Sequence, residues 1–167
     1  MFLSVATFLK VWEKEAKSTQ RILGALTEDS LNQLVTAQDR TLGRIVWHIV
    51  TTIPEMMGRT GLMLECINED APLPNTTEEI LHSYEEVSHS LETAIRHQWN
   101  DQSLLEKKDM YGETWTNSHT LSALIDHQIH HRGQITVLMR QAGLKVPGIY
   151  GPSREDWRQI GMELPRI

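Results

Sequence analysis

Four stretches of the chain repeat apolar residues at steps of three and four, the spacing that lines one face of an α-helix. Polar, proline- or glycine-containing segments separate them, so the pattern predicts an all-α protein. Four long helices joined by loops are typical of a four-helix bundle. The predicted helices run from Phe2 to about Thr27, from Thr41 to Ile67, from Thr76 to about Trp99, and from Ser118 or Thr120 to Gly143.

Shorter elements are expected between and after these helices. Residues 101–117 lack a helical pattern, and Tyr111-Gly112-Glu113 indicates a turn, which predicts an ordered excursion with a short strand pair. Ser153 is expected to cap a short C-terminal helix, and Pro54 should kink the second helix because proline lacks a backbone N–H. The chain has no internal repeat or domain linker, so residues 1–167 are predicted to form one domain.

The charge and composition argue against several classes of partner. A net charge of -6 does not suit nucleic-acid binding, which needs a basic surface. No stretch approaches the ~20 uncharged apolar residues of a membrane span, and the N-terminus does not resemble a signal peptide. The single cysteine, Cys66, excludes an intrachain disulfide and fits a reducing compartment. We therefore expect a cytoplasmic protein without a nucleic-acid or membrane partner.

Histidines are unevenly placed and suggest a metal site. Four of the eight lie between His119 and His131. His127 and His131 are four residues apart, so they share one helix face and can chelate a metal together. The glutamate of the HExxH metalloprotease motif is missing between them, which excludes that class.

His48 is the best candidate for a third ligand. It lies in the apolar run Ile45–Val50, where an imidazole without a partner would be costly. Helical bundles build metal sites from facing helices, and three imidazoles with an open position are typical of catalytic sites. From the residues alone, His48 could instead be a hydrogen-bonded core residue and the histidine pair a chance spacing. His130 points away from the pair, and a solvated face is expected for three others, His82, His89 and His97.

Two segments resemble a known family. The run from His127 to Ile135, followed by Leu138 to Gly143, is similar to the HxxxHHRGQ…LRxxG segment of the DinB-like (DinB/YfiT) family of metal-dependent enzymes. Thr41 to Ile49 resembles the second-helix segment of that family, which carries one ligand histidine. The one departure nearby is Met139, where the family usually has leucine. The resemblance implies a four-helix bundle of up-down-down-up topology, a homodimer, and a divalent metal site formed by His48, His127 and His131.

The resemblance also implies an activity. Some family members transfer low-molecular-weight thiols such as bacillithiol, mycothiol or glutathione, so a metal-dependent thiol S-transferase that detoxifies electrophiles is expected. Zn or Ni is the first choice of metal, with Mn and Fe as further options, because imidazole suits several divalent ions. Gln134 follows His131 by three residues and could orient water or substrate. Glu55 follows His48 by seven and could accept a hydrogen bond near the metal or act as a base.

Other interpretations stay open at this point. Gln134 could make only a packing hydrogen bond, and Glu55 could be only a surface carboxylate. Arg132 is expected to form an ion pair that fixes its helix. The same histidines would also serve a hydrolase that uses metal-bound water. A third option is a stress-induced, dimeric metal-binding protein without catalysis.

Overall fold

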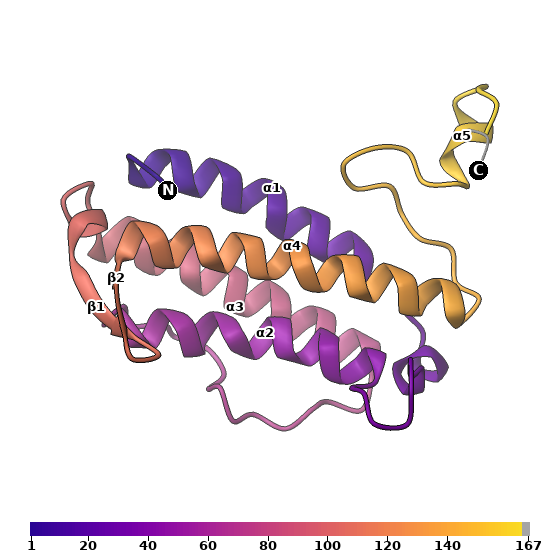
Figure 1. The fold of residues 1–167 in the computed structure, drawn as a ribbon, viewed down its shortest axis with the longest axis horizontal. Coiled ribbons are helices and arrows are strands. Elements are labelled where there is room, and N and C mark those ends of the chain that lie inside the picture. Colours follow the sequence, from indigo (N-terminus) through magenta and orange to yellow (C-terminus); the bar gives the residue numbers. More distant parts are fainter. Residues whose placement is uncertain (165–167) are drawn as a thin grey trace.

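The computed structural model describes residues 1–164, in which four long helices lie side by side (Figure 1). Residues 165–167, included in the predicted domain, lie outside this range. Helices α1 and α4 run in one direction and α2 and α3 in the other, with residues 60–76 crossing over between α2 and α3. This confirms the four-helix bundle of up-down-down-up topology. The helices are α1 (Val5–Leu23), α2 (Leu42–Arg59), α3 (Thr77–Gln98) and α4 (Asn117–Gln141).

Each long helix begins at a serine or threonine whose side chain accepts a hydrogen bond from a backbone N–H of the first turn. These residues are Ser4, Thr41, Thr76 and Thr116. At α3 the glutamate Glu79 bonds back to the N–H of Thr76, which completes the capping box indicated by the sequence. Each such cap typically stabilises a helix by about 1 kcal/mol. The local sequence therefore fixes where the four helices start.

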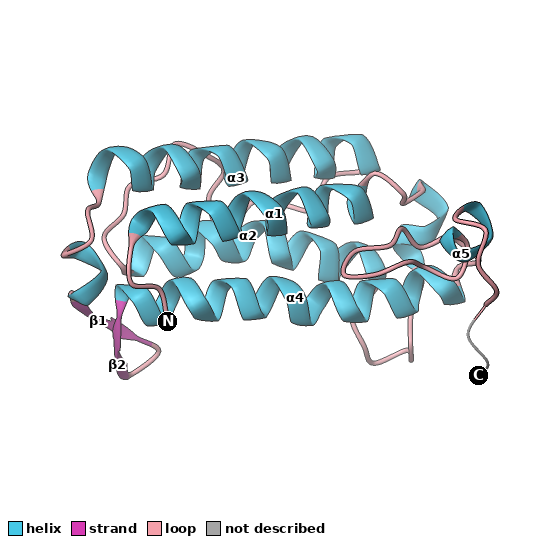
Figure 2. Cartoon of the chain, turned by 90° about the horizontal axis from the view of Figure 1, so that it is seen from above, coloured by secondary structure: helices cyan, strands magenta, loops and turns pink. Residues whose placement is uncertain are grey.

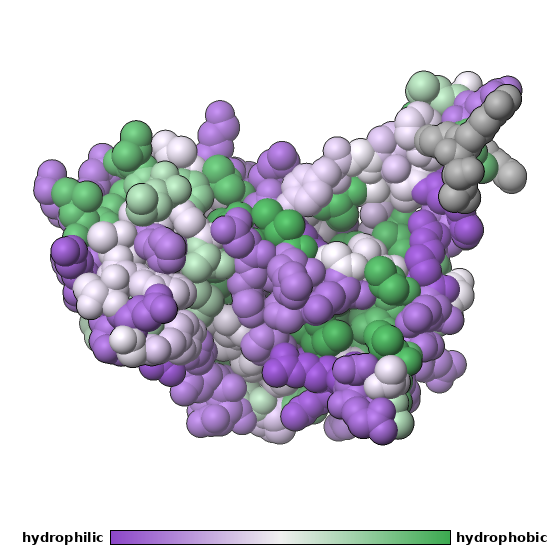
Figure 3. All heavy atoms as spheres, in the orientation of Figure 1, coloured by the Kyte–Doolittle hydropathy of each residue, from purple (hydrophilic) through white to green (hydrophobic). Residues whose placement is uncertain are grey.

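The apolar faces meet in one core that runs the length of the bundle. Buried side chains from all four helices form it, and both small strands lie at one end, beside the start of α4 (Figure 2). On the face seen in Figure 3, hydrophilic side chains dominate and hydrophobic ones gather in separate patches. No helix among the described residues is long and apolar enough to cross a membrane. The largest fully buried side chains include Phe8, Trp12, Ile49, Ile53, Met57, Tyr84, Leu91 and Ile95.

The excursion between α3 and α4 contains the predicted strand pair. Strand β1 (Lys107–Met110) pairs antiparallel with β2 (Glu113–Thr116). Tyr111 and Gly112 join them with φ values of 59° and 84°, the left-handed pair that a two-residue hairpin turn requires. Two short 3-10 helices, Glu28–Asn32 and Ser103–Leu105, lie in segments for which the sequence pattern indicated no helix. The short C-terminal helix α5 covers Asp156–Gln159.

Three predicted helix boundaries were wrong. The first helix begins at Val5, not at Phe2, under the cap of Ser4. The second helix continues through Pro54 but ends at Arg59, not at Ile67. Its end is fixed by Thr60, whose hydroxyl donates to the carbonyl of Met57, and by Gly61 at a φ of 84°. The fourth helix begins at Asn117 under the cap of Thr116, earlier than the predicted Ser118 or Thr120, because the hairpin delivers the chain directly into the helix.

Candidate metal centre

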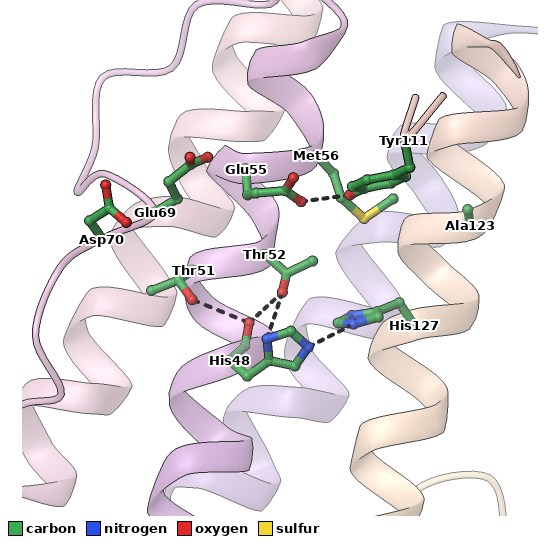
Figure 4. Close-up of a pocket in the computed structure, with 10 residues that line it drawn as sticks. All are labelled: His48, Thr51, Thr52, Glu55, Met56, Glu69, Asp70, Tyr111, Ala123 and His127. Carbon is green, nitrogen blue, oxygen red and sulfur yellow. Dashed lines mark hydrogen bonds between the residues drawn. The ribbon is translucent and has the colours of Figure 1, made fainter. Parts of the chain in front are cut away.

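Helices α2 and α4 bring the three singled-out histidines together. The Nε2 atom of His127 lies 3.1 Å from Nε2 of His48 and 3.1 Å from Nε2 of His131. His48 comes from α2, and the other two lie one turn apart on α4, as their spacing predicted. Figure 4 shows His48 and His127 facing each other across the gap between the helices. Among the described residues these three form a cluster that could hold a metal ion.

The outer nitrogens of two of these rings are hydrogen-bonded to neighbours on the same helix. Nδ1 of His48 lies 3.3 Å from the hydroxyl of Thr52, which donates its own hydrogen to the carbonyl of His48 and so accepts from the ring. Nδ1 of His131 donates to Oε1 of Gln134 at 2.6 Å. With the proton on Nδ1, each ring turns a lone pair at Nε2 towards the centre of the cluster.

The three Nε2 atoms do not carry enough protons to hydrogen-bond to one another. His48 and His131 both present lone pairs, and a neutral His127 can donate one Nε2 proton to only one of them. A metal ion shared by the three Nε2 atoms removes this mismatch, and 3.1 Å is short enough for two nitrogens to lie within ~2.1 Å of one ion. Nδ1 of His127 is buried and has no hydrogen-bond partner. The donor set therefore fits a divalent metal.

The surroundings keep the imidazoles neutral. Burial, aided by the charge of Arg40, lowers the pKa of His48 to about 4. Burial and the neighbouring histidines lower the pKa of His127 to about 4, and burial also lowers the pKa of His131. Since a metal binds only the neutral ring, the cluster is ready to accept an ion at neutral pH without releasing protons.

A buried glutamine fixes the relative position of α2 and α4 at the cluster itself. Nε2 of Gln128, the residue after His127, donates to the carbonyl of Ile49, the residue after His48, at 2.8 Å. Its Oε1 accepts from the hydroxyl of Tyr84 on α3 at 3.2 Å and from that of Thr19 on α1 at 3.5 Å. One fully buried side chain thus ties all four helices together beside the ligands.

A pocket of about 570 Å³ opens on the side of His48 and His127 (Figure 4). Three carboxylates, Glu55, Glu69 and Asp70, line it together with Thr51, Thr52, Met56, Tyr111 and Ala123. The indole of Trp47 donates to the carbonyl of Ala71 at 2.7 Å, which holds the crossover segment against α2 and so places the last two acids. The cluster is therefore accessible to a small molecule.

Glu55 lines this pocket, but it hydrogen-bonds to residues other than the histidines. Its carboxylate accepts from Nε of Arg59 at 2.6 Å and from the hydroxyl of Tyr111 at 2.6 Å. Tyr111 lies in the hairpin turn, and its ring stacks on the Arg59 guanidinium. Burial and the carboxylate of Glu55 raise the pKa of Tyr111 to about 12, so the phenol stays a donor at neutral pH. The hairpin thus supplies one wall of the pocket.

The remaining histidines are exposed, in line with the sequence interpretation. His130 and the three on α3 lie at the surface. Arg132 forms the expected ion pair, with Glu15 on α1, and both side chains are buried. Sequence reasoning missed Thr52, Gln128 and Tyr111. For Thr52 a signal was present, because it follows His48 by four residues and so shares its face; for Tyr111, far away in sequence, there was none.

The comparisons with known proteins agree with this geometry. Residues 1–162 match the model of the DinB family. The chain is 46% identical, over 100% of both chains, to the uncharacterised protein YrdA of Bacillus subtilis strain 168. A DinB-like protein of Bacillus cereus ATCC 10987 matches it with a TM-score of 0.86 and 44% identity, over 90% of this chain and 100% of that one. The DinB-like protein YjoA of Bacillus subtilis shares the fold, with a TM-score of 0.66 and 18% identity over 86% and 96% of the two chains. The chain belongs to the DinB family.

Proposed function

We propose that this protein is a divalent-metal-dependent enzyme that activates a low-molecular-weight thiol for transfer to an electrophile. The observation that carries the proposal is the convergence of three neutral imidazoles at the edge of a pocket, with no fourth protein ligand among the described residues. Three imidazoles and a free position are the pattern of a catalytic rather than a structural metal site. Zn and Ni are the first candidates for the ion.

The residues around the cluster suit this activity. A divalent ion held there would lower the pKa of a thiol placed at its open position, so that the thiolate forms near neutral pH. Gln134 holds the ring of His131 through Nδ1 and sets its direction. Glu55 is one of three carboxylates in the pocket that could take a proton from a ligand, and Tyr111 and Arg59 fix its position.

A hydrolase is the second candidate, and the same carboxylate favours it. Glu55 shares the pocket with His48 and His127, where it could accept a proton from an attacking water. Turnover of an ester or amide without added thiol would identify this activity. Metal binding without turnover of either substrate class would leave a non-catalytic metal-binding protein.

We include a homodimer in the proposal. Several large apolar side chains of the C-terminal segment, Ile160, Met162 and Leu164, are exposed in the single chain, which supports an additional contact there. Light scattering after size exclusion measures the mass directly, and a value near 19.2 kDa would contradict the dimer.

The first test is metal content. Untagged protein, purified beside His48→Ala, His131→Ala and the matched control His130→Ala, is analysed by mass spectrometry for bound metal. We expect about one equivalent in the wild type and in the control, and loss in both cluster variants. The loaded protein is then assayed for thiol transfer to an electrophile, with ester hydrolysis in parallel. A wild type that fails to take up Zn or Ni at micromolar concentration would overturn the proposal.

A further inference from the structure

A second pocket lies on the other side of the cluster. It has a volume of about 540 Å³ and reaches the cluster through His131, whereas the first pocket reaches it through His48 and His127. Four apolar side chains form much of its wall: Val35, Ile45, Val137 and Leu138. The polar ones are Asp39, Arg40, His131 and Gln134. The histidine cluster therefore separates two pockets of different character, the first of which is lined by three acids.

Arg40 is the cation of this second pocket, and it has no ion-pair partner among the described residues. The neighbouring carboxylate of Asp39 instead accepts a hydrogen bond from the hydroxyl of Thr36 at 2.7 Å, within its own loop. By contrast, Arg132 in the core and Arg140 beside another pocket each pair with a carboxylate. The guanidinium of Arg40 is thus available to a ligand.

Arg40 lies close to the histidine cluster, because it lines the same pocket as His131 and Gln134. The residue is exposed, so water solvates its charge when no ligand is bound. A metal ion held by the cluster would be repelled by the guanidinium. An anionic ligand in the second pocket would neutralise this repulsion and contact both.

We propose that the second pocket binds a small organic carboxylate with a short apolar chain, its carboxylate on Arg40 and its chain against Val35 and Val137. The guanidinium offers a planar pair of donors that matches a carboxylate, and both valines are exposed in the absence of a ligand. The inference rests on the proposed function, because it takes the histidine cluster as the reaction centre. It adds that the ligand beside this centre carries a negative charge and a short apolar chain.

Hexanoate and hexanol are suitable probes, because they share a chain length and differ in charge. Binding to the zinc-loaded protein is followed by two-dimensional NMR at constant ionic strength. We expect hexanoate to bind at least tenfold more tightly than hexanol, with shifts concentrated at residues 35–45 and 131–138. Arg40→Ala should reduce this preference to about twofold or less. Arg44→Ala, which removes an exposed arginine in the first turn of α2, should retain it. Asp39→Asn should strengthen hexanoate binding, because Asp39 is the only carboxylate among the described residues that line the pocket.

Two results would overturn the inference. One is equal affinity for hexanoate in the wild type and in Arg40→Ala, which would place the anion elsewhere, such as on the zinc alone. The other is a set of shifts confined to the pocket of Glu55. Zinc content is measured on the same samples, so the two proposals fail separately. A protein that holds no zinc but keeps the preference that depends on Arg40 contradicts the enzyme proposal alone, and a zinc-loaded protein without that preference contradicts this inference alone.

Discussion

The two sides of α4 carry polar side chains that are satisfied in different ways. His127 and His131 face α2, and the next residue after each, Gln128 and Arg132, faces α1 and α3. Gln128 bonds to three other helices, and Arg132 pairs with the carboxylate of Glu15 and donates to its carbonyl at 2.7 Å. The histidines instead turn lone pairs towards one another. The glutamine–arginine side is therefore largely paired within the protein, with only Nε of Arg132 left without a hydrogen-bond partner among the polar atoms of these two side chains. The histidine side would be completed by an added cation.

The two sides of α4 should therefore contribute to different properties, one to the stability of the fold and the other to metal affinity. Burial alone would raise the pKa of Glu15, but hydrogen bonds from Tyr150 and Arg132 lower it, so the carboxylate stays charged and paired in the core. Substitutions on that side should change the free energy of unfolding. Substitutions on the histidine side should change metal affinity and leave the fold largely intact, because the imidazoles are only partly buried.

The largest effect is expected for Arg132→Met. Removing the arginine leaves the charge of Glu15 buried without its partner, which typically costs about 3–5 kcal/mol. Chemical denaturation of the metal-free protein measures it. Arg140→Met is the matched control, because the pair of Arg140 with Glu155 is more exposed, and its loss should cost at most about 1 kcal/mol. Equal losses in the two variants would contradict the distinction.

On the opposite side, His127→Ala should strongly weaken metal binding and hardly change the free energy of unfolding of the metal-free protein. His127 is the ring whose Nε2 lies 3.1 Å from both others, so its removal leaves two ligands. We expect the affinity for zinc to fall at least 100-fold, which is about 2.7 kcal/mol. Competition with a chelating dye measures it. The exposed neighbour His130, changed to alanine, should retain wild-type affinity; a similar loss there would point to a disturbed helix instead of a lost ligand.

The stability of the metal-free protein should fall in acid because of the same rings. The pKa values of His48 and His127 are about 4 in the folded chain, below the ordinary value of 6.5. Between these values the unfolded chain binds protons that the folded chain does not, so the free energy of unfolding decreases as the pH falls from about 6.5 to about 4. Denaturation midpoints across this range measure the decrease. The decrease of the free energy of unfolding with falling pH should be smaller in His127→Ala than in the wild type. An equal decrease in the two proteins would show that the pKa of His127 is not lowered by folding.

The smallest effect is expected for the residues that orient the rings. Thr52→Val and Gln134→Leu remove the acceptors of the Nδ1 protons of His48 and His131. Loss of such a partner typically weakens metal affinity by about 10- to 100-fold. We expect the lower end because each neighbour lines a pocket from which water can replace the lost hydrogen bond. Thr51→Val is the control, since its hydroxyl donates to the backbone carbonyl of Trp47. A loss of the same size in the control would mean that pocket polarity, not ring orientation, governs affinity.

Much of the site could be predicted from local spacing. The pairing of His127 with His131, the place of His48 on an apolar helix and the proximity of Gln134 all follow from the periodicity of a helix. Glu55 lines the pocket beside His48 and His127, but its partner Tyr111 lies 56 residues away in the hairpin, and no local pattern connects them. The predicted second helix was longer than the observed one. Apolar residues after Thr60 continue the helical spacing, but they lie in a loop that packs against the core.

The sequence by itself determined the helices, their caps and which side chains share a face, because these depend on residues within one or two turns of each other. Only the tertiary structure decided that two pockets flank the cluster, that Gln128 holds α2 and α4 in register, and that Arg40 has no ion-pair partner among the described residues. These features depend on contacts between segments that are distant in the sequence. The packing of whole helix faces determines such contacts, and the spacing of residues along the chain does not reveal them.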